Sequence, residues 1–284
     1  MNNTEHPEGQ GEASFSGQSV ARELQADQAI DGAAINPWDA MAEHRAEVLK
    51  NGLDRSYEDL CLQVTDSITE AVARGSKVLD VGCGVGYLTK KLTDSGYSVV
   101  GADIAPGSIE VGRRVFGLDA VVGGPQEAVE HNHGEPFDAV VANMVAHCVK
   151  DLETFYSDAA AALKPGGLLF VTVPDQMWAQ NHADSLAVQG NWSDDQFTHT
   201  TVAREFAASG AHYQSQVTYY LRNPAAYLHY AASYFEAEAP ASLATPLDRE
   251  SYDLGESERA SNSEDARDAL GDIMLFKFRK KNDA

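Results

Sequence analysis

Three glycines at alternate positions stand in the stretch Val78–Tyr87, and this spacing is typical of a ligand-binding turn. The apolar residues before the turn predict a β-strand, and Leu88–Leu92 after it predicts a helix. Gly82, Gly84 and Gly86 let the chain turn sharply between the two, because glycine tolerates positive φ. The missing Cβ atoms let the backbone approach a ligand closely, and the following helix presents free N–H groups to it.

Two acidic residues are expected beside this turn. Asp80 closes the strand before the turn, and Asp103 follows a second predicted strand, Ser98–Ala102. In a doubly wound sheet the second acid lies next to the turn, where its two oxygens can accept hydrogen bonds from both hydroxyls of a ribose. Dinucleotide enzymes use a similar turn, so these residues alone do not choose between ligands.

Further motifs extend the pattern along the chain. Ala120–Val122 and Phe137–Asn143 predict a third and a fourth strand, and Leu168–Val173 predicts a fifth strand after the turn Leu163–Gly167. In this order and at this spacing, the motifs resemble those of the class I S-adenosylmethionine (SAM) methyltransferases. The resemblance covers roughly residues 55–175 and is strongest to the small-molecule branch that includes the quinone-biosynthesis methyltransferases.

The resemblance implies a fold and a reaction. The fold is α/β, a Rossmann-like doubly wound sheet of seven strands with a helical cap inserted before the last strand. The reaction is in-line methyl transfer from SAM to a small-molecule acceptor at oxygen or nitrogen. An NAD(P)-dependent oxidoreductase would explain the glycine turn and Asp103, but not the Leu163–Gly167 turn. A protein that binds SAM without catalysis would explain all of these motifs.

The resemblance also implies which residues contact SAM. Asp80 is expected to hold the methionine amino group, Asp103 the ribose and Ile104 the adenine ring. The other expected cofactor contacts are Trp38, Gly82, Cys83, Gly84, Gly86, Gln126, Glu127, Asn143 and Met144. Gln126 and Glu127 depart from the commoner Gly-Asp-Ala pattern of the family.

His147 is the candidate catalytic residue. It follows the fourth strand, close to the expected position of the sulfonium, and imidazole titrates near neutral pH. Rival bases are His182, His199 and His229, in segments whose fold cannot be placed from the sequence. A base is needed only if the acceptor must lose a proton, because the methyl group of a sulfonium is already activated.

A long insertion is expected near the C-terminus. The alternating segment His212–Leu221 predicts strand six, Ile273–Arg279 predicts the last strand, and about fifty residues separate them. Pro224–Ala237 predicts a helical part of a cap. Tyr227 and Tyr230 lie at helical spacing on one face with Tyr234, so they are expected to contact the acceptor substrate.

The domain organisation combines the composition of the N-terminal tail with what the family resemblance implies. We expect a disordered tail over residues 1–33 and one methyltransferase domain over 34–284, with its core at 55–175 and cap elements at 176–200 and 222–271. Between the cap elements, Thr201–Ser209 predicts a helix that ends at Gly210.

The charge and the cysteine spacing of the chain disfavour nucleic acid as a partner and a zinc site. The chain has 284 residues and a formal net charge of −22, which disfavours binding to nucleic acid. Its three cysteines, Cys61, Cys83 and Cys148, show no metal-ligand spacing and fit a reducing, cytoplasmic compartment. No apolar run is long enough to span a membrane, and no signal-peptide pattern is seen. The oligomeric state has no signature in the sequence.

Overall fold

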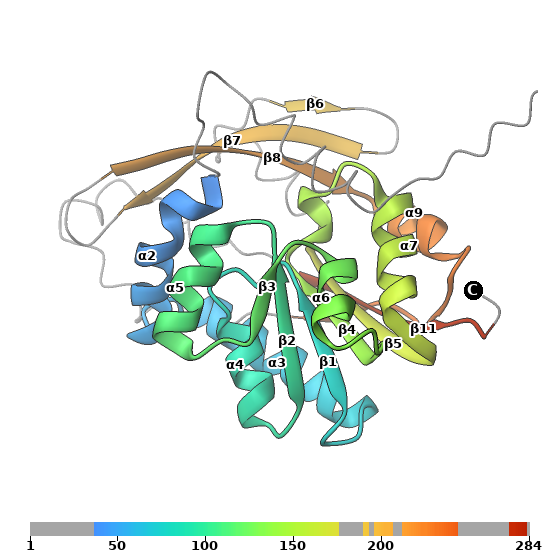
Figure 1. Cartoon of the computed structure of the whole chain (residues 1–284). Helices are drawn as coiled ribbons and strands as arrows, with labels where there is room; N and C mark the ends of the chain where they lie inside the picture. The colour runs from blue at the N-terminus through green and yellow to red at the C-terminus, as the bar shows by residue number, and fades with distance from the viewer. Residues whose placement is uncertain (1–36, 176–189, 193–195, 207–211, 244–272, 283–284) are drawn as a thin grey trace, which may run out of the picture.

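The computed structural model describes residues 37–175, 190–192, 196–206, 212–243 and 273–282. Figure 1 shows a mostly parallel central sheet with helices packed on both of its faces, as in the predicted Rossmann-like α/β fold. The fold prediction is thereby confirmed. The predicted disordered tail and most of the two predicted cap elements lie outside the described residues.

The helices alternate with the strands along the core. The helices are α2 (Pro37–Lys50), α3 (Arg55–Ala71), α4 (Tyr87–Asp94), α5 (Pro106–Phe116), α6 (Pro125–His131), the 3-10 helix η1 (Ala146–Cys148), α7 (Leu152–Ala162) and α9 (Pro224–Ala231). The core strands are β1 (Lys77–Val81), β2 (Ser98–Asp103), β3 (Ala120–Val122), β4 (Phe137–Asn143) and β5 (Leu163–Pro174). The later strands are β6 (Gly190–Trp192), β7 (Gln196–Phe206), β8 (His212–Arg222), β9 (Phe235–Ala237), β10 (Ala241–Leu243) and β11 (Ile273–Lys280).

The strand order places the glycine turn at the centre of the main sheet. Across the described strands the order is β10-β11-β5-β4-β1-β2-β3, and β9 also pairs with β11. β1 pairs in parallel with both β2 and β4, whereas β11 runs antiparallel to β5. The chain therefore leaves β1 at a switch point, with the carboxyl ends of β2 and β4 on either side, where open α/β sheets bind ligands.

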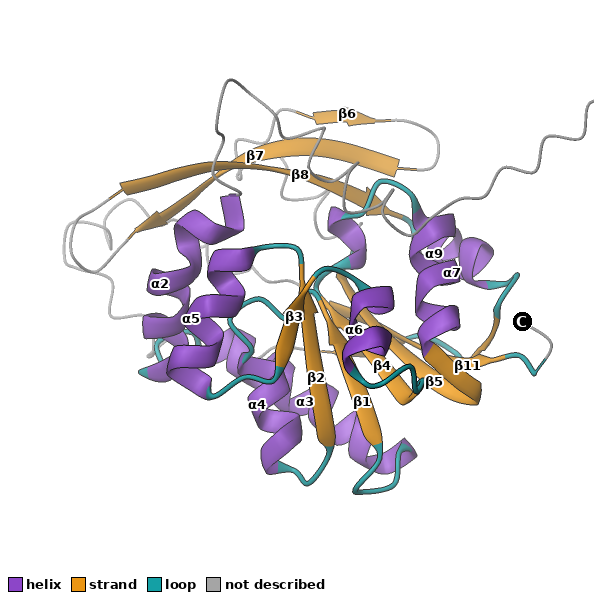
Figure 2. Ribbon diagram, viewed as in Figure 1, coloured by secondary structure: helices purple, strands orange, loops and turns teal. Residues whose placement is uncertain are grey.

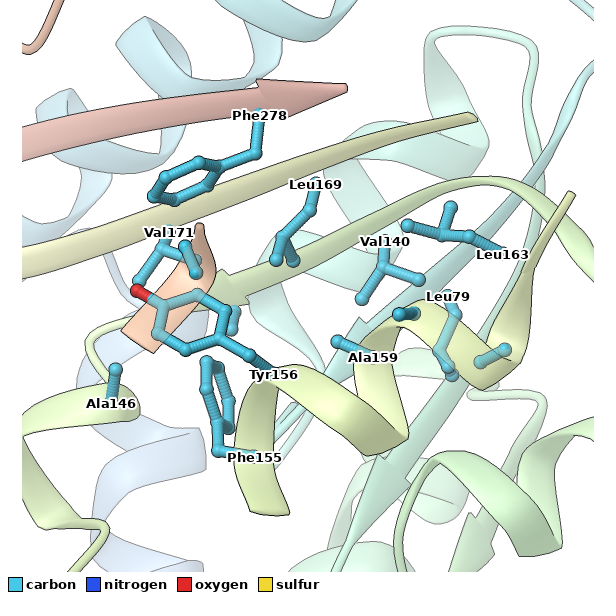
Figure 3. Packing of buried hydrophobic residues seen from close by; sticks show 14 of the residues in the cluster. Leu79, Val140, Ala146, Phe155, Tyr156, Ala159, Leu163, Leu169, Val171 and Phe278 are labelled. Carbon is cyan, nitrogen blue, oxygen red and sulfur yellow. The ribbon is translucent and has the colours of Figure 1, made fainter. Parts of the chain in front are cut away.

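Alternate residues of the strands pack on opposite faces of the sheet. Val78 is fully buried with residues of α3 and α4, and the next residue, Leu79, is fully buried with residues of α6 and α7. Figure 3 shows the second face, where Val171 and Leu169 of β5 lie near Tyr156 of α7 and Val140 of β4 lies closer to Ala159. Burial on both faces explains the nearly continuous apolar runs in these strands.

Side-chain caps fix where several helices begin. Asp54 accepts a hydrogen bond from the backbone N–H of Tyr57 at the start of α3, over 3.0 Å. Asn223 accepts one from Ala226 at the start of α9, over 2.9 Å. These short polar side chains satisfy N–H groups that the first helical turn leaves without a carbonyl partner.

Two predictions about the segment after the core are wrong. Thr201–Ser209, predicted as a helix, lies largely within the strand β7. His212–Leu221 is a strand as predicted, but it pairs with β7 in a separate sheet of order β6-β7-β8, and not with the main sheet. The strand that pairs with the outer side of the last strand, β11, is β10. Alternation of residues predicts a strand but does not specify its neighbour.

The second sheet lies over the edge of the main sheet where the glycine turn is found. Figures 1 and 2 show β7 and β8 crossing above the carboxyl ends of the parallel strands, and β8 contacts both η1 and α2. The predicted helix at Pro224–Ala237 is shorter than expected, because α9 ends at Ala231 and Phe235–Ala237 forms β9. α9 packs against α7 at the side of the sheet.

Candidate active site

The glycine turn after β1 has an unusual backbone at all three glycines. The φ angles are +68° at Gly82, +54° at Gly84 and +84° at Gly86. A Cβ atom added at Gly82 would overlap the side chain of Val145, and one at Gly86 would overlap that of Leu118. A Cβ added at Gly84 would have no protein atom within 4 Å. Gly82 and Gly86 are thus required by packing, whereas Gly84 faces open space.

Asp103 joins the end of β2 to this turn. One oxygen of its carboxylate accepts a hydrogen bond from the backbone N–H of Gly84 over 2.8 Å, and the other accepts from Ala105 over 2.8 Å. Burial raises the pKa of Asp103, and these backbone hydrogen bonds oppose that shift. Each oxygen keeps a further lone pair with which it can accept from a ligand.

Asp80 lies beneath the turn and is 1% exposed. Its carboxylate accepts a hydrogen bond from the hydroxyl of Thr89 over 2.6 Å. Burial raises the pKa of Asp80 to about 7, and the negative charge of Asp103 adds to the shift. A cation placed near this pair of carboxylates would favour their charged forms.

A third carboxylate reaches the same region from α2. Asp39 Oδ1 accepts hydrogen bonds from the backbone N–H groups of Gly107, over 2.6 Å, and Ser108, over 3.2 Å, at the start of α5. It raises the pKa of Asp103 further by its negative charge. The backbone carbonyl of Trp38 accepts from the Ser108 hydroxyl over 3.2 Å, so α2 is fastened to the helix that follows Asp103.

Two of the predicted cofactor contacts, Cys83 and Ile104, differ in how their side chains are placed. Cys83 is buried with Ile109, Leu118 and Ala120, so its side chain points into the core and leaves only its backbone at the turn. Ile104 is half-buried immediately after Asp103. A cofactor contact by either residue stays a prediction.

Asn143 and Met144 stand at the end of β4, as predicted. Asn143 is buried, and its Oδ1 accepts a hydrogen bond from the Thr172 hydroxyl over 2.6 Å. Met144 has a φ of +60°, a conformation that side-chain-bearing residues adopt at a cost. Backbone strain of this kind recurs at ligand-binding sites, although His133, with a φ of +61°, has it in the turn after α6.

Gln126 and Glu127 lie at the start of α6, after β3. The Glu127 carboxylate accepts a hydrogen bond from the backbone N–H of Gly124 over 2.8 Å and so caps the helix. The exposed Gln126 amide donates to Glu130 over 3.2 Å along the helix surface. Both side chains therefore have partners within the chain, and their contact with adenine stays a prediction.

His147 lies in η1 and is 5% exposed. The loop before it contains Val145, which packs on Gly82, and η1 is in contact with β8 of the second sheet. Of its rivals, His182 falls outside the described residues, His199 is in β7 and His229 is exposed on α9. The structure brings His147 to the edge that carries the glycine turn, and a catalytic role for it stays a prediction.

The two predicted acceptor residues have different environments. Tyr227 is 1% exposed, and its ring centroid lies 5.4 Å from that of Phe276 in the core. Tyr230 is 38% exposed, and Tyr234 lies beyond the end of α9. The three tyrosines therefore do not form one helical face, and an acceptor role for Tyr227 or Tyr230 stays a prediction.

Comparison with known proteins decides the family. A family described as a methyltransferase domain matches residues 42–210, more than half of the chain. The chain belongs to this methyltransferase family. Among curated proteins, the human mitochondrial ubiquinone biosynthesis O-methyltransferase is 43% identical over 106 residues, which are 34% of this chain and 28% of that protein. The corresponding enzyme of Bartonella bacilliformis is 33% identical over 125 residues, which are 43% of this chain and 50% of that protein.

These curated relatives are matched over only part of their own length. The matched part of the chain spans 28% of the human relative and 50% of the Bartonella relative. Solved structures match over more of the chain. A protein of Pyrococcus horikoshii has a TM-score of 0.56 at 18% identity, covering 79% of this chain and 91% of its own. An S-adenosylmethionine-dependent methyltransferase of Clostridium acetobutylicum has a TM-score of 0.54 at 12% identity, covering 79% and 92%. These two likenesses concern the fold alone.

Several residues with contacts at the candidate site were not predicted from the sequence. Asp39, Tyr57 and Thr172 are contributed by α2, α3 and β5, and Arg222 by the end of β8. Asp39 comes directly after Trp38, a predicted cofactor contact, so its place in the sequence could have suggested it as a candidate. The other three have no motif around them, so only their tertiary contacts reveal them.

Neither a membrane-spanning helix nor a clustered metal site is found among the described residues. Within the described ranges, no helix is long and apolar enough to cross a membrane. In the same part of the chain, no group of three or more histidine, cysteine or acidic side chains is arranged to hold a metal ion.

Proposed function

We propose that the chain transfers a methyl group from SAM to a hydroxyl group of a small molecule. The observation that carries this proposal is the set of three carboxylates, Asp39, Asp80 and Asp103, around a glycine turn whose central residue faces open space. SAM carries a positive sulfonium and a positive ammonium group. Acidic side chains in a partly desolvated site attract such a ligand.

The residues present fit SAM. Asp103 holds one backbone N–H on each oxygen and has lone pairs left for the two hydroxyls of the ribose. Asp80 is the acid expected to attract the methionine ammonium, and the backbone at Gly84 allows close approach. Membership of the methyltransferase family supports the same ligand.

The same geometry argues against the dinucleotide alternative. In NAD(P) enzymes the glycine turn and the start of its helix receive the negatively charged pyrophosphate. Here the buried Asp80 lies under that turn, with Asp103 close enough to raise its pKa. Negative phosphates would add to this repulsion, whereas a cation relieves it.

The acceptor is inferred from the named relatives and from the position of His147. The matched curated relatives are O-methyltransferases of ubiquinone biosynthesis, which favours a phenolic hydroxyl as the acceptor. When bound, SAM supplies an activated methyl group, which the acceptor oxygen takes as the carbon–sulfur bond breaks and the hydroxyl proton leaves. His147 is the residue of this chain proposed to receive that proton.

The remaining contribution of the chain is alignment and exclusion of water. The second sheet, through β8, lies against α2 and η1 above the carboxyl ends of the parallel strands. A covered site of this kind holds the reactants in line and keeps water from the charged centre. We further propose a reducing, cytoplasmic setting, which the free thiols of Cys61, Cys83 and Cys148 support.

A two-part experiment tests this function. Calorimetric titration with SAM, S-adenosylhomocysteine and NADH should give heat with the first two and none with NADH. Transfer of a radiolabelled methyl group from SAM should then be measured against a panel of catechols, simple phenols and amines. Transfer to phenolic hydroxyls supports the proposal, and transfer only to amines would correct the acceptor atom. Binding of SAM without transfer to any of them would favour a non-catalytic SAM-binding protein.

A further inference from the structure

The loop that follows β4 begins with a strained residue. Met144 has a φ of +60°, in the left-handed region that favours glycine. Its neighbour Val145 packs so closely on Gly82 that a Cβ atom at Gly82 would overlap it. The conformation of Met144 therefore sets how this loop meets the glycine turn, and something must hold that conformation against its cost.

Thr172 of β5 accepts hydrogen bonds that stabilise this conformation of Met144. The backbone N–H of Met144 donates to the Thr172 hydroxyl over 2.9 Å and to the Thr172 carbonyl over 3.1 Å. The same hydroxyl donates to Asn143 Oδ1 over 2.6 Å. One hydroxyl thus accepts from the strained residue and donates to the residue before it, which fixes the direction of both hydrogen bonds.

This hydroxyl is buried and linked to the helix on the same face of the sheet. Thr172 is 0% exposed and Asn143 is 6% exposed. The Asn143 amide nitrogen lies 3.4 Å from the Tyr57 hydroxyl and 3.8 Å from Cys61 Sγ, both on α3. The network therefore ties the end of β4 to β5 and α3, and Asn143 would lose the donor to its side-chain oxygen if the threonine hydroxyl were removed.

We propose that Thr172 is a positioning residue, whose hydroxyl holds Met144 in its left-handed conformation and thereby sets the loop Met144–His147 against the glycine turn for cofactor binding. The inference rests on the proposed function, because it assigns Thr172 to the SAM side of that site. Thr172 acts through the backbone of Met144 and not by touching the reacting atoms.

The primary test replaces the hydroxyl with a methyl group of nearly the same size. Thr172→Val should weaken binding of S-adenosylhomocysteine about fivefold, the usual effect of one buried hydrogen bond, because the carbonyl of residue 172 still accepts from Met144. Thr172→Ser keeps the hydroxyl and should stay within about twofold of the original affinity. Thr65→Val is the matched control, since Thr65 is buried and its hydroxyl donates to the Cys61 carbonyl within α3.

A double variant that also carries Met144→Gly distinguishes positioning of Met144 by Thr172 from simple stabilisation of the sheet. In Met144→Gly the positive φ carries little cost, so Thr172→Val added to it should weaken binding by less than about twofold. If Thr172 only stabilises the sheet, Thr172→Val should cost the same affinity in both backgrounds. Steady-state kinetics of the Thr172→Val variant should show a raised KM for SAM with a smaller change in kcat.

Each outcome has one meaning. Equal affinities of the unmodified chain and Thr172→Val would overturn the inference while leaving the proposed function intact. No binding of S-adenosylhomocysteine by the unmodified chain would refute the proposed function itself. If Thr172→Val does not fold while Thr172→Ser does, the hydroxyl is required by the whole fold, and a dedicated positioning role is wrong.

Discussion

The carboxylate of Asp103 accepts a 2.8 Å hydrogen bond from the backbone N–H of Gly84. This contact joins the end of β2 to the turn after β1 and orients both in advance of ligand binding. It also places a negative charge close to the buried Asp80, whose pKa it helps to raise. The relationship explains why the acid and the glycine are both needed, and it leads to the first two predictions.

Asp103→Ala should weaken SAM binding by roughly 2–4 kcal/mol while the protein remains folded. The figure takes two hydrogen bonds to a charged acceptor at about 1.5–3 kcal/mol each, reduced because neighbouring contacts are not additive. Calorimetry measures the affinity and thermal unfolding checks the fold. Asp94→Asn, at an exposed acid on α4, is the control and should leave SAM binding unchanged. An unaltered dissociation constant in folded Asp103→Ala would refute the ribose contact.

Stability of the ligand-free protein should fall as the pH rises from about 4 to about 7 through the titration of Asp80. Its pKa is about 7 in the folded protein against an ordinary value of 3.8, so the folded state binds more protons than the unfolded chain in this window. The raised pKa of Asp103 acts in the same direction.

Asp80→Asn should therefore flatten the pH dependence of the free energy of unfolding over this window, as measured by denaturant titrations. SAM binding should release protons near neutral pH, because a cation favours the charged form of Asp80. Calorimetry in buffers of different ionisation enthalpy detects that release. An Asp80→Asn profile identical to the original would show that this carboxylate does not govern the effect.

Gly84→Ala should abolish tight SAM binding but cost only about 1 kcal/mol of stability. The added Cβ meets no protein atom within 4 Å, so the folded chain has only the cost of a positive φ. Gly117→Ala is a matched control, because Gly117 has a φ of +68° and equally open surroundings at the end of α5. Both variants should lose similar stability, but only Gly84→Ala should lose affinity.

Arg222→Met should raise the KM for the acceptor more than it weakens SAM binding. The buried guanidinium of Arg222 donates to the carbonyls of Val149 over 2.8 Å and Lys150 over 2.6 Å, next to η1. Its loss leaves those acceptors without this donor and should cost about 2–5 kcal/mol of stability. Arg74→Met is the control, because exposed Arg74 donates to the Ser95 carbonyl over 2.9 Å away from the site. Equal effects on both substrates would contradict a role in fixing the second sheet.

Replacing Tyr227 and Tyr230 with alanine should give different results. Tyr227→Ala removes a core ring packed near Phe276 and should destabilise the protein by about 3–5 kcal/mol. Tyr230→Ala, at a residue 38% exposed, should change stability by less than about 0.5 kcal/mol. Melting temperature and acceptor kcat/KM are measured for both. A selective loss of acceptor use in Tyr230→Ala would support its predicted substrate contact.

The cofactor side of the site was accessible to sequence reasoning because its signals are local. The turn requires glycine at set positions, because the backbone there has positive φ and packs closely on neighbouring side chains. These requirements appear in the sequence as glycines at a fixed spacing between a strand and a helix. Asp103 follows an equally clear strand, and the order of parallel strands brings both ends to one edge. The family could therefore be recognised from the amino-acid sequence, and the domain match agrees with it.

The segment after the core could not be placed in the same way. The sequence predicted a strand at His212–Leu221, but the helix predicted at Thr201–Ser209 concealed its partner, the preceding strand β7, and β11 pairs instead with β10. The predicted helix at Thr201–Ser209 is wrong because six of its residues, 201–206, pair with β8, and this pairing overruled their intrinsic preference.

By itself, then, the amino-acid sequence determined the five core strands, the glycine turn and the acids at the ends of β1 and β2, since each follows from residues close together in the chain. Only the tertiary structure decided that Asp39 joins these acids, that Thr172 holds Met144, and that Arg222 fastens a second sheet beside His147. Such contacts join elements separated by 28 to 73 residues, and burial makes each of these polar groups take the partner that folding brings to it.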